Sequence, residues 1–135
     1  MNYHIKSFES FSNIEECSID DLIQRGKIDN FGIGGIGGPH NLDASTKPED
    51  FLRIHFLNVR SKKLTSLKGI EKFPNLTYLN AYDNLLKDMS GIEKCQSLKE
   101  LHVSKNQLTT LNHICLLQNL EELHISENRL EFLTN

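Results

Sequence analysis

The stretch LTYLNAYDNLLKDMSGIEKCQS, residues 76–97, decides the fold, because the sequence on both sides repeats its pattern at a fixed spacing of 22 residues. The preceding unit is IHFLNVRSKKLTSLKGIEKFPN (54–75), and the units that follow are LKELHVSKNQLTTLNHICLLQN (98–119) and the partial LEELHISENRLEFLTN (120–135). The units align without insertion or deletion, and Gly-Ile-Glu-Lys recurs at 69–72 and 91–94. Such a period is typical of a solenoid, in which each unit buries its apolar face against its neighbours.

Two hydrophobic periods alternate within each unit. In the unit 76–97, Leu79 and Ala81 are two positions apart, which is the spacing of side chains on one face of a β-strand. Apolar residues then recur every third position, at Leu86, Met89, Ile92 and Cys95. A period of three fits a 3₁₀-helical or extended return segment better than an α-helix. Each unit therefore predicts one short strand followed by a compact return.

The pattern L-x-x-L-x-L-x-x-N-x-L, followed by apolar residues at every third position, resembles the leucine-rich repeat. It is most similar to the 22-residue class typified by a protein phosphatase 1 regulator, and the resemblance covers residues 54–135. The resemblance implies an α/β leucine-rich repeat solenoid with a curved parallel sheet on its concave face. It also implies 3₁₀ or extended segments on the convex face, and a concave face that binds a partner.

Stacking of the units predicts three buried columns of equivalent side chains. The columns are Leu57, Leu79, Leu101 and Leu123; Val59, Ala81, Val103 and Ile125; and Leu64, Leu86, Leu108 and Leu130. Cys95 occupies the place of Phe73 and Leu117 in neighbouring units, which predicts a buried structural thiol.

An asparagine follows each of the last three predicted strands, at Asn84, Asn106 and Asn128. At these positions the chain turns inward, and an amide side chain can both donate to and accept from backbone groups that the turn leaves without partners. We therefore expect a buried asparagine ladder. Lys62 stands at the equivalent place in the first unit, so the ladder is expected to end there.

Residues 1–53 lie outside the repeat and predict an amino-terminal cap for its first unit. Ser18, followed by Asp20 and Asp21 and later by Gly26, has the start and stop signals of a short helix at about 19–25. A second helical start lies within 46–52, where Pro48 is followed by two acidic residues. Terminal units of a solenoid must be covered, and these segments would supply the cover.

Gly32-Ile33-Gly34-Gly35-Ile36-Gly37 matches the dinucleotide-binding pattern G-x-G-x-x-G letter for letter. The pattern binds a pyrophosphate only where it ends a buried strand and opens a helix. Residues 24–31 do not have the pattern of a buried parallel strand, and Pro39 halts any helix that would follow. We therefore expect a glycine-rich loop at 32–38 that is flexible or packs closely on the cap, and no cofactor.

Composition narrows the class of protein. The chain has 135 residues and a net charge of −3, so no broad basic field favours nucleic acid or an acidic membrane. The amino-terminal residues lack a signal-peptide pattern and no apolar run reaches the ~20 residues of a membrane span, which predicts a cytoplasmic protein. Three cysteines without C-x-x-C spacing indicate neither a disulfide framework nor a zinc site.

The residues that alternate with the buried leucines are expected to form the concave face. They give the candidate partner-binding residues Phe56, Asn58, Arg60, Tyr78, Asn80, Tyr82, Glu100, His102, Glu122 and His124. Phe56, Tyr78 and Tyr82 are of the types that dominate binding hot spots. The sequence thus predicts a non-enzymatic protein-interaction module, an adaptor or regulatory subunit, with no catalytic residue.

The sequence is also compatible with other functions. The apolar residues of the partial unit 120–135 predict an edge that another chain could cover, as in a larger cytoskeletal or ciliary assembly or a homo-oligomer, and the sequence could equally be a fragment of a longer array. His102 and His124 should lie on adjacent strands beside Glu100 and Glu122, which leaves a metal site as a minor alternative. The same pair could make partner binding sensitive to pH. A bacterial immunity or effector role is a further alternative.

Overall fold

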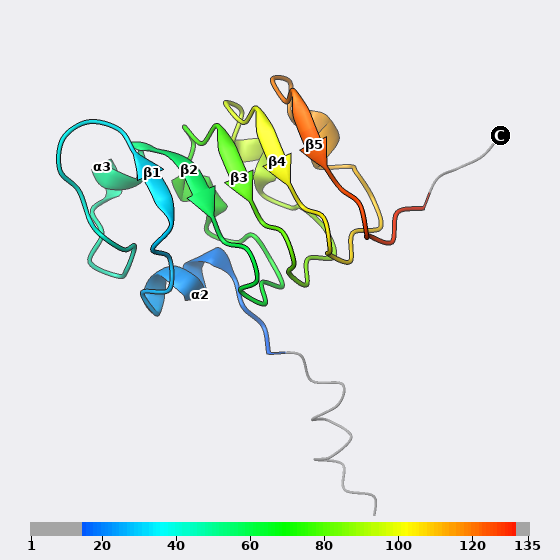
Figure 1. Ribbon diagram of the computed structural model, residues 1–135, viewed down its shortest axis with the longest axis horizontal. Helices are drawn as coiled ribbons and strands as arrows, with labels where there is room; N and C mark the ends of the chain where they lie inside the picture. Colours follow the sequence, from blue (N-terminus) through cyan, green and yellow to red (C-terminus); the bar gives the residue numbers. More distant parts are fainter. Residues whose placement is uncertain (1–14, 132–135) are drawn as a thin grey trace, which may run out of the picture.

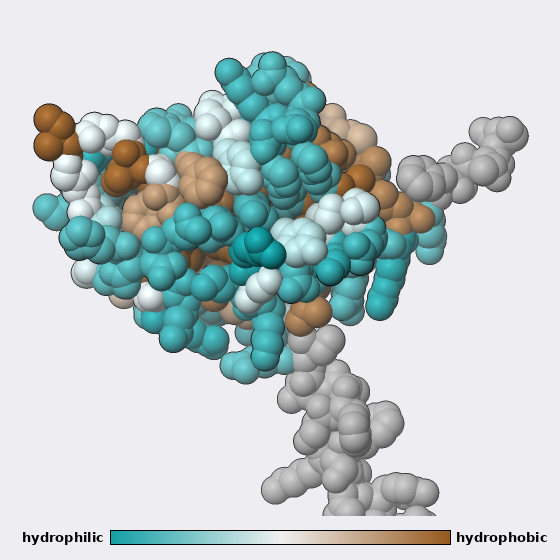
Figure 2. All heavy atoms as spheres, viewed as in Figure 1, coloured by the Kyte–Doolittle hydropathy of each residue, from teal (hydrophilic) through white to brown (hydrophobic). Residues whose placement is uncertain are grey.

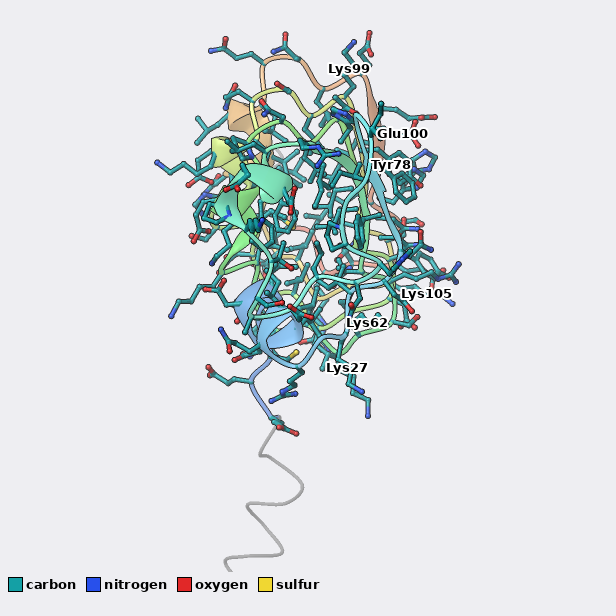
Figure 3. The ribbon with its side chains drawn as sticks, turned by 90° about the vertical axis from the view of Figure 1, so that its left-hand side faces the viewer. Lys27, Lys62, Tyr78, Lys99, Glu100 and Lys105 are labelled. Carbon is teal, nitrogen blue, oxygen red and sulfur yellow. The ribbon has the colours of Figure 1, made fainter. Side chains whose placement is uncertain are left out.

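The computed structural model describes residues 15–131, in which a five-stranded sheet curves along the molecule and short helical turns lie on its other side (Figures 1 and 3). The elements in chain order are α2 (Ile19–Gln24), β1 (Phe31–Ile33), α3 (Pro48–Phe51), β2 (Ile54–Asn58), the 3₁₀ turn η1 (Ile70–Lys72), β3 (Tyr78–Asn80), η2 (Ile92–Lys94), β4 (Glu100–His102), η3 (Ile114–Leu116) and β5 (Glu122–His124). Each of the repeating units contributes one strand, and the first three also contribute one 3₁₀ turn, as their two hydrophobic periods predict.

The strands lie in the order β1-β2-β3-β4-β5. β2 to β5 are parallel, and Leu57, Leu79, Leu101 and Leu123 pair successively across the sheet. The 22-residue period of the sequence is therefore the register of the sheet. β1 is antiparallel to β2, so the sheet is mostly rather than wholly parallel.

The core consists of the predicted columns. Leu57, Leu79 and Leu101 are fully buried, and so are the equivalent residues of the other two columns in the first three units. The members from the fourth unit, Leu123, Ile125 and Leu130, are only partly buried. Cys95 is fully buried at the predicted place in the stack, next to Phe73, whose carbonyl oxygen lies 3.5 Å from its Sγ.

The asparagine ladder is present at the end of the strands. Asn84 Oδ1 accepts hydrogen bonds from the Lys62 and Leu64 N–H groups, both at 3.0 Å, and its Nδ2 donates to the Val59 carbonyl at 3.0 Å. Asn106 and Asn128 make equivalent bonds one and two units further along. Each amide thus joins its own turn to that of the preceding unit. In the first unit, where Lys62 stands in place of an asparagine, Asn84 of the next unit accepts the hydrogen bonds of the turn.

The helix expected at 19–25 is observed as α2. Ser18 and Asp21 form a reciprocal capping box at its start, and Ile19, Leu22 and Ile23 are buried. The Asp20 N–H donates to the Lys68 carbonyl at 2.9 Å, so α2 lies against the return segment of the first unit. Gly69 allows this approach, because a Cβ there would lie 2.8 Å from the Asp20 nitrogen. The role of residues 1–53 as a cap stays a prediction, and residues 1–14 lie outside the described part.

The prediction of a loop over 32–38 is wrong at its amino-terminal end. Phe31–Ile33 forms β1, in which Phe31 and Ile33 pack against the core while Gly32 pairs with Phe56. The loop begins at Gly34, and its turn uses positive φ angles at Gly35, Gly37 and Gly38. Arg53 organises it, since Nε donates to the Gly34 carbonyl at 2.8 Å and Nη2 donates to the Gly37 carbonyl at 2.6 Å.

Candidate functional site: the concave sheet face

The sheet brings most of the sequence-predicted site residues into two rows on one face. The first row runs across the strands through Gly32, Phe56, Tyr78, Glu100 and Glu122, and the second through Asn58, Asn80, His102 and His124. Residues of one row are direct register partners on neighbouring strands. Arg60 and Tyr82 follow two residues after the ends of β2 and β3 and complete the predicted set.

Four aromatic rings follow one another across this face as two stacked pairs, with a tilted contact between Tyr78 and His102. Phe56, Tyr78, His102 and His124 are called here the ring ladder. The Phe56 and Tyr78 rings are stacked with centroids 4.7 Å apart, and Tyr78 lies 5.1 Å from His102. The two histidine rings are parallel within 6° at 4.1 Å. Such ring pairs add about 0.5–1.5 kcal/mol beyond the area that they bury, which favours this arrangement of the side chains.

Two carboxylates flank the histidine end of the ring ladder. Glu100 Oε2 lies 2.6 Å from His102 Nε2, and Glu122 Oε1 lies 3.3 Å from His124 Nε2. The hydrogen bond with His102, followed by one with Glu122, lowers the pKa of Glu100, so this carboxylate stays ionised. Burial, and then the negative charges of Glu100 and Glu122, raise the pKa of the Tyr78 phenol, which stays neutral.

The opposite end of the strands carries Arg60 and Lys105 around the Tyr82 ring, with Asp83 and Glu127 near Lys105. The Arg60 guanidinium lies 5.0 Å from the Tyr82 ring centroid, and Lys105 Nζ lies 5.5 Å from it. The phenol of Tyr82 raises the pKa of Lys105, which therefore keeps its charge. Figure 3 shows Tyr78 and Glu100 together on the sheet side, with Lys105 and Lys62 toward the other end of the strands.

The predicted binding residues Asn58 and Asn80 have a local structural task. Their Oδ1 atoms accept hydrogen bonds from the Arg60 and Tyr82 N–H groups, each at 3.0 Å. These Asx turns orient the two residues that follow the strands. The two asparagines therefore position Arg60 and Tyr82 as well as lying on the face.

Ser104, which alternation places on the concave side, is buried instead. Its Oγ accepts from the Ser126 N–H at 3.1 Å and also contacts the Ser126 hydroxyl at 3.1 Å. The serines form a link between adjacent turns because the strands end at His102 and His124, and strict alternation stops there. Within residues 15–131 no group of three or more His, Cys, Asp or Glu side chains is arranged to hold a metal ion.

Sequence reasoning missed the contribution of β1. Gly32 continues the first row beside Phe56, and the three atoms nearest to a Cβ placed on it all belong to Phe56, the closest at 3.1 Å. The signal was the alternation of Phe31 and Ile33 around one glycine, which has the period of a strand. The hydrogen bonds from Arg53 to the glycine loop have no sequence signal, because their acceptors are backbone carbonyls, which every residue has.

The surface seen in Figure 2 reflects this order of residues. Apolar residues show at both ends of this view, near β1 and β2 and again near β5, while hydrophilic side chains cover the region over β4. A separate cavity of about 500 Å³ lies away from the ring ladder, lined by residues of α2, α3 and η1, including Ile23, Phe51 and Lys72. No helix among residues 15–131 has the length and apolar character to cross a bilayer.

The architecture defines the class: the chain has a leucine-rich repeat type of α/β fold. No family model and no curated protein matches the sequence. Among solved structures, an internalin (inlF) from Listeria monocytogenes is similar over 62% of this chain and 25% of its own length, with 22% identity and a TM-score of 0.58. An internalin C2 from the same species is similar over 62% of this chain and 37% of its own, with 20% identity and a TM-score of 0.58. The chain thus spans well under half the length of these structures.

Proposed function

We propose that this chain is a non-enzymatic protein-interaction module, an adaptor or regulatory subunit that binds a protein partner on its concave face. The observation that carries the proposal is the ring ladder, which places Phe56 and Tyr78 in a stacked, partly exposed pair beside charged groups. Rigid aromatic residues surrounded by polar ones are the usual composition of a binding hot spot. The leucine-rich repeat fold supports the same assignment, because the family resemblance implies binding at this face.

The proposal also includes a cellular compartment and a repeat class. We place the protein in a reducing, cytoplasmic compartment, which its three free cysteines favour. We also keep the 22-residue, phosphatase-regulator-like repeat class as the closest description of its repeats, which makes a phosphatase one candidate partner.

The test removes the two tyrosines of the face. Partners are captured from the native source with the wild type and identified, and their affinities are then measured with the purified Tyr78→Ala/Tyr82→Ala variant. We expect a loss of at least tenfold. The control is Leu52→Ala/Leu116→Ala, which truncates two side chains that are 50% and 54% exposed and lie outside the two rows. Unchanged binding by a folded tyrosine variant would remove the concave-face assignment.

A second candidate is an assembly subunit held through the β5 side of the sheet. The observation that favours it is the partial exposure of Leu123 and Ile125, whose equivalents Leu101 and Val103 are fully buried. A copy of the chain or another protein that covered this side would bury them. Sedimentation across a hundredfold concentration range tests self-association; a monomer throughout would argue against a homo-oligomer at β5.

A further inference from the structure

The concave face offers different chemistry at its two ends along the first row. At the β1 end, Gly32 presents no side chain beside Phe56. The face of the Phe56 ring that is turned away from Tyr78 therefore has no β1 side chain opposite it in register. Because Phe56 and Tyr78 are already stacked within 15° of parallel, a further flat ring could extend the same stack over Gly32.

At the β4–β5 end, the row closes with two carboxylates. Glu100 and Glu122 are direct register partners, and each contacts a histidine on its own strand. Among residues 15–131 neither carboxylate forms an ion pair with a lysine or an arginine. Glu100 also shares a hydrogen bond with Glu122, and the two side chains are 33% and 54% exposed, so solvent reaches both carboxylates. A lysine ammonium or an arginine guanidinium binds carboxylates through charge-assisted hydrogen bonds.

From these two ends we propose the partner's chemistry: the concave face binds an extended segment that carries an aromatic residue and, about four positions later, a lysine or arginine. The aromatic ring stacks on Phe56 over Gly32, and the cation binds at Glu100 and Glu122. This inference rests on the proposed function, since it names what the same face recognises. The charges of the two sides are complementary, because the carboxylates lack a cationic partner within the described chain.

The spacing follows from the sheet. Three inter-strand steps of about 4.8 Å separate β1 from β4, which is roughly 14 Å. An extended chain advances about 3.3 Å per residue, so four residues span roughly 13 Å. A segment that crosses the strands along the first row would therefore place residue i over Gly32 and residue i+4 at Glu100. From there a long lysine or arginine side chain also reaches Glu122, about 5 Å further on.

The experiment selects binders from a random 12-residue peptide display library against the full chain, and then measures affinities of synthetic peptides. We expect enrichment of an aromatic residue followed four positions later by lysine or arginine. Glu100→Gln/Glu122→Gln should weaken binding of an enriched peptide at least tenfold and flatten its dependence on salt between 50 and 500 mM. Glu16→Gln/Glu49→Gln removes two exposed charges outside the two rows, is the matched charge control and should change nothing.

The aromatic end is tested separately with Gly32→Val, which places a side chain beside Phe56. Binding of the enriched peptide should fall at least fivefold, whereas a peptide with alanine in place of its aromatic residue should bind both proteins equally weakly. If Gly32→Val does not fold, Phe56→Leu removes the ring while keeping an apolar side chain, and the same loss is expected.

The outcomes distinguish a failure of the proposed partner chemistry from a failure of binding at the concave face. This inference would be overturned if no peptide is enriched over a control without protein. It would also be overturned if the enriched peptides lack the aromatic and cationic pair but lose binding in Tyr78→Ala/Tyr82→Ala. Either result leaves binding at the concave face intact. Enriched peptides that bind Tyr78→Ala/Tyr82→Ala as tightly as the wild type would contradict both proposals.

Discussion

Asn106 is buried between two strand ends, and backbone groups of two neighbouring repeats depend on its amide. Its Oδ1 accepts from the Leu86 N–H at 3.0 Å, and its Nδ2 donates to the Ala81 and Val103 carbonyls at 3.0 and 3.1 Å. A residue without both a donor and an acceptor cannot satisfy these three groups, which explains the asparagine at this position of the repeat.

We expect Asn106→Leu to lower the free energy of unfolding by roughly 3 to 5 kcal/mol, because each buried backbone group left without a partner costs about 1–3 kcal/mol. Asn119→Ala is the control, since Asn119 is exposed and donates one bond to the Gln96 carbonyl. It should cost less than about 1 kcal/mol. Urea denaturation measures both, and equal losses would show that the ladder is not the source of the difference.

Cys95 gives a prediction for alkaline pH. Burial raises the pKa of its thiol from 9.0 to about 12. Below pH 9 the thiol is protonated in both states and its contribution is fully present. Above pH 9 the unfolded chain ionises while the native chain does not, so stability falls by up to about 1.4 kcal/mol per pH unit. Cys95→Ala should therefore show a shallower loss of stability between pH 9 and 11; parallel curves would contradict this origin.

At the scale of elements, the glycine loop that follows β1 is held by one side chain, that of Arg53, the residue before β2. Arg53 bonds the carbonyls of Gly34, Ile36 and Gly37 and pairs with Asp50 at 3.0 Å. The planar fork of a guanidinium matches several acceptors at once, which an ammonium does not. The fully exposed Ile36 is thus carried on a loop with a defined shape.

Arg53→Lys should release this loop while leaving the repeats intact. We expect faster amide hydrogen exchange confined to residues 34–38 and a change in global stability below about 2 kcal/mol. Asp50→Asn is the control, because it removes the ion pair but keeps the bonds from Arg53 to the loop carbonyls. Unaltered exchange in Arg53→Lys would mean that the glycine backbone holds the shape by itself.

The elements also show how far the sequence could predict the molecule. The strands, the leucine columns and the asparagine ladder follow from a period that translates directly into stacking, so Leu79, Asn84 and their equivalents could be placed in advance. The adjacency of His102 and His124 followed from the same period. β1 left a weaker signal, because the alternation of Phe31 and Ile33 covers only three residues, and its antiparallel pairing with β2 lies outside the repeat and is not specified by the period.

At the scale of the whole molecule, burial decreases toward β5. Leu101 on β4 is fully buried, while Leu123 at the equivalent position on β5 is only partly buried. Each repeat of a solenoid is stabilised by its neighbours, and among residues 15–131 β5 pairs with β4 alone, whereas β4 pairs with both β3 and β5. The proposed binding face includes both a firmly packed strand and a less firmly packed one, because its acidic pair consists of Glu100 on β4 and Glu122 on β5.

This gradient predicts unequal costs for the same substitution. Leu101→Ala should lower the free energy of unfolding by about 2–5 kcal/mol, the usual cost for a fully buried leucine, and Leu123→Ala by roughly 1–2 kcal/mol, because less apolar surface is lost. Urea denaturation at two protein concentrations a hundredfold apart measures both. If instead Leu123→Ala costs as much as Leu101→Ala, and more at the higher concentration, then a second molecule covers β5 in solution. In that case Glu122 lies beside an interface between copies, and a peptide at the acidic pair would compete with assembly.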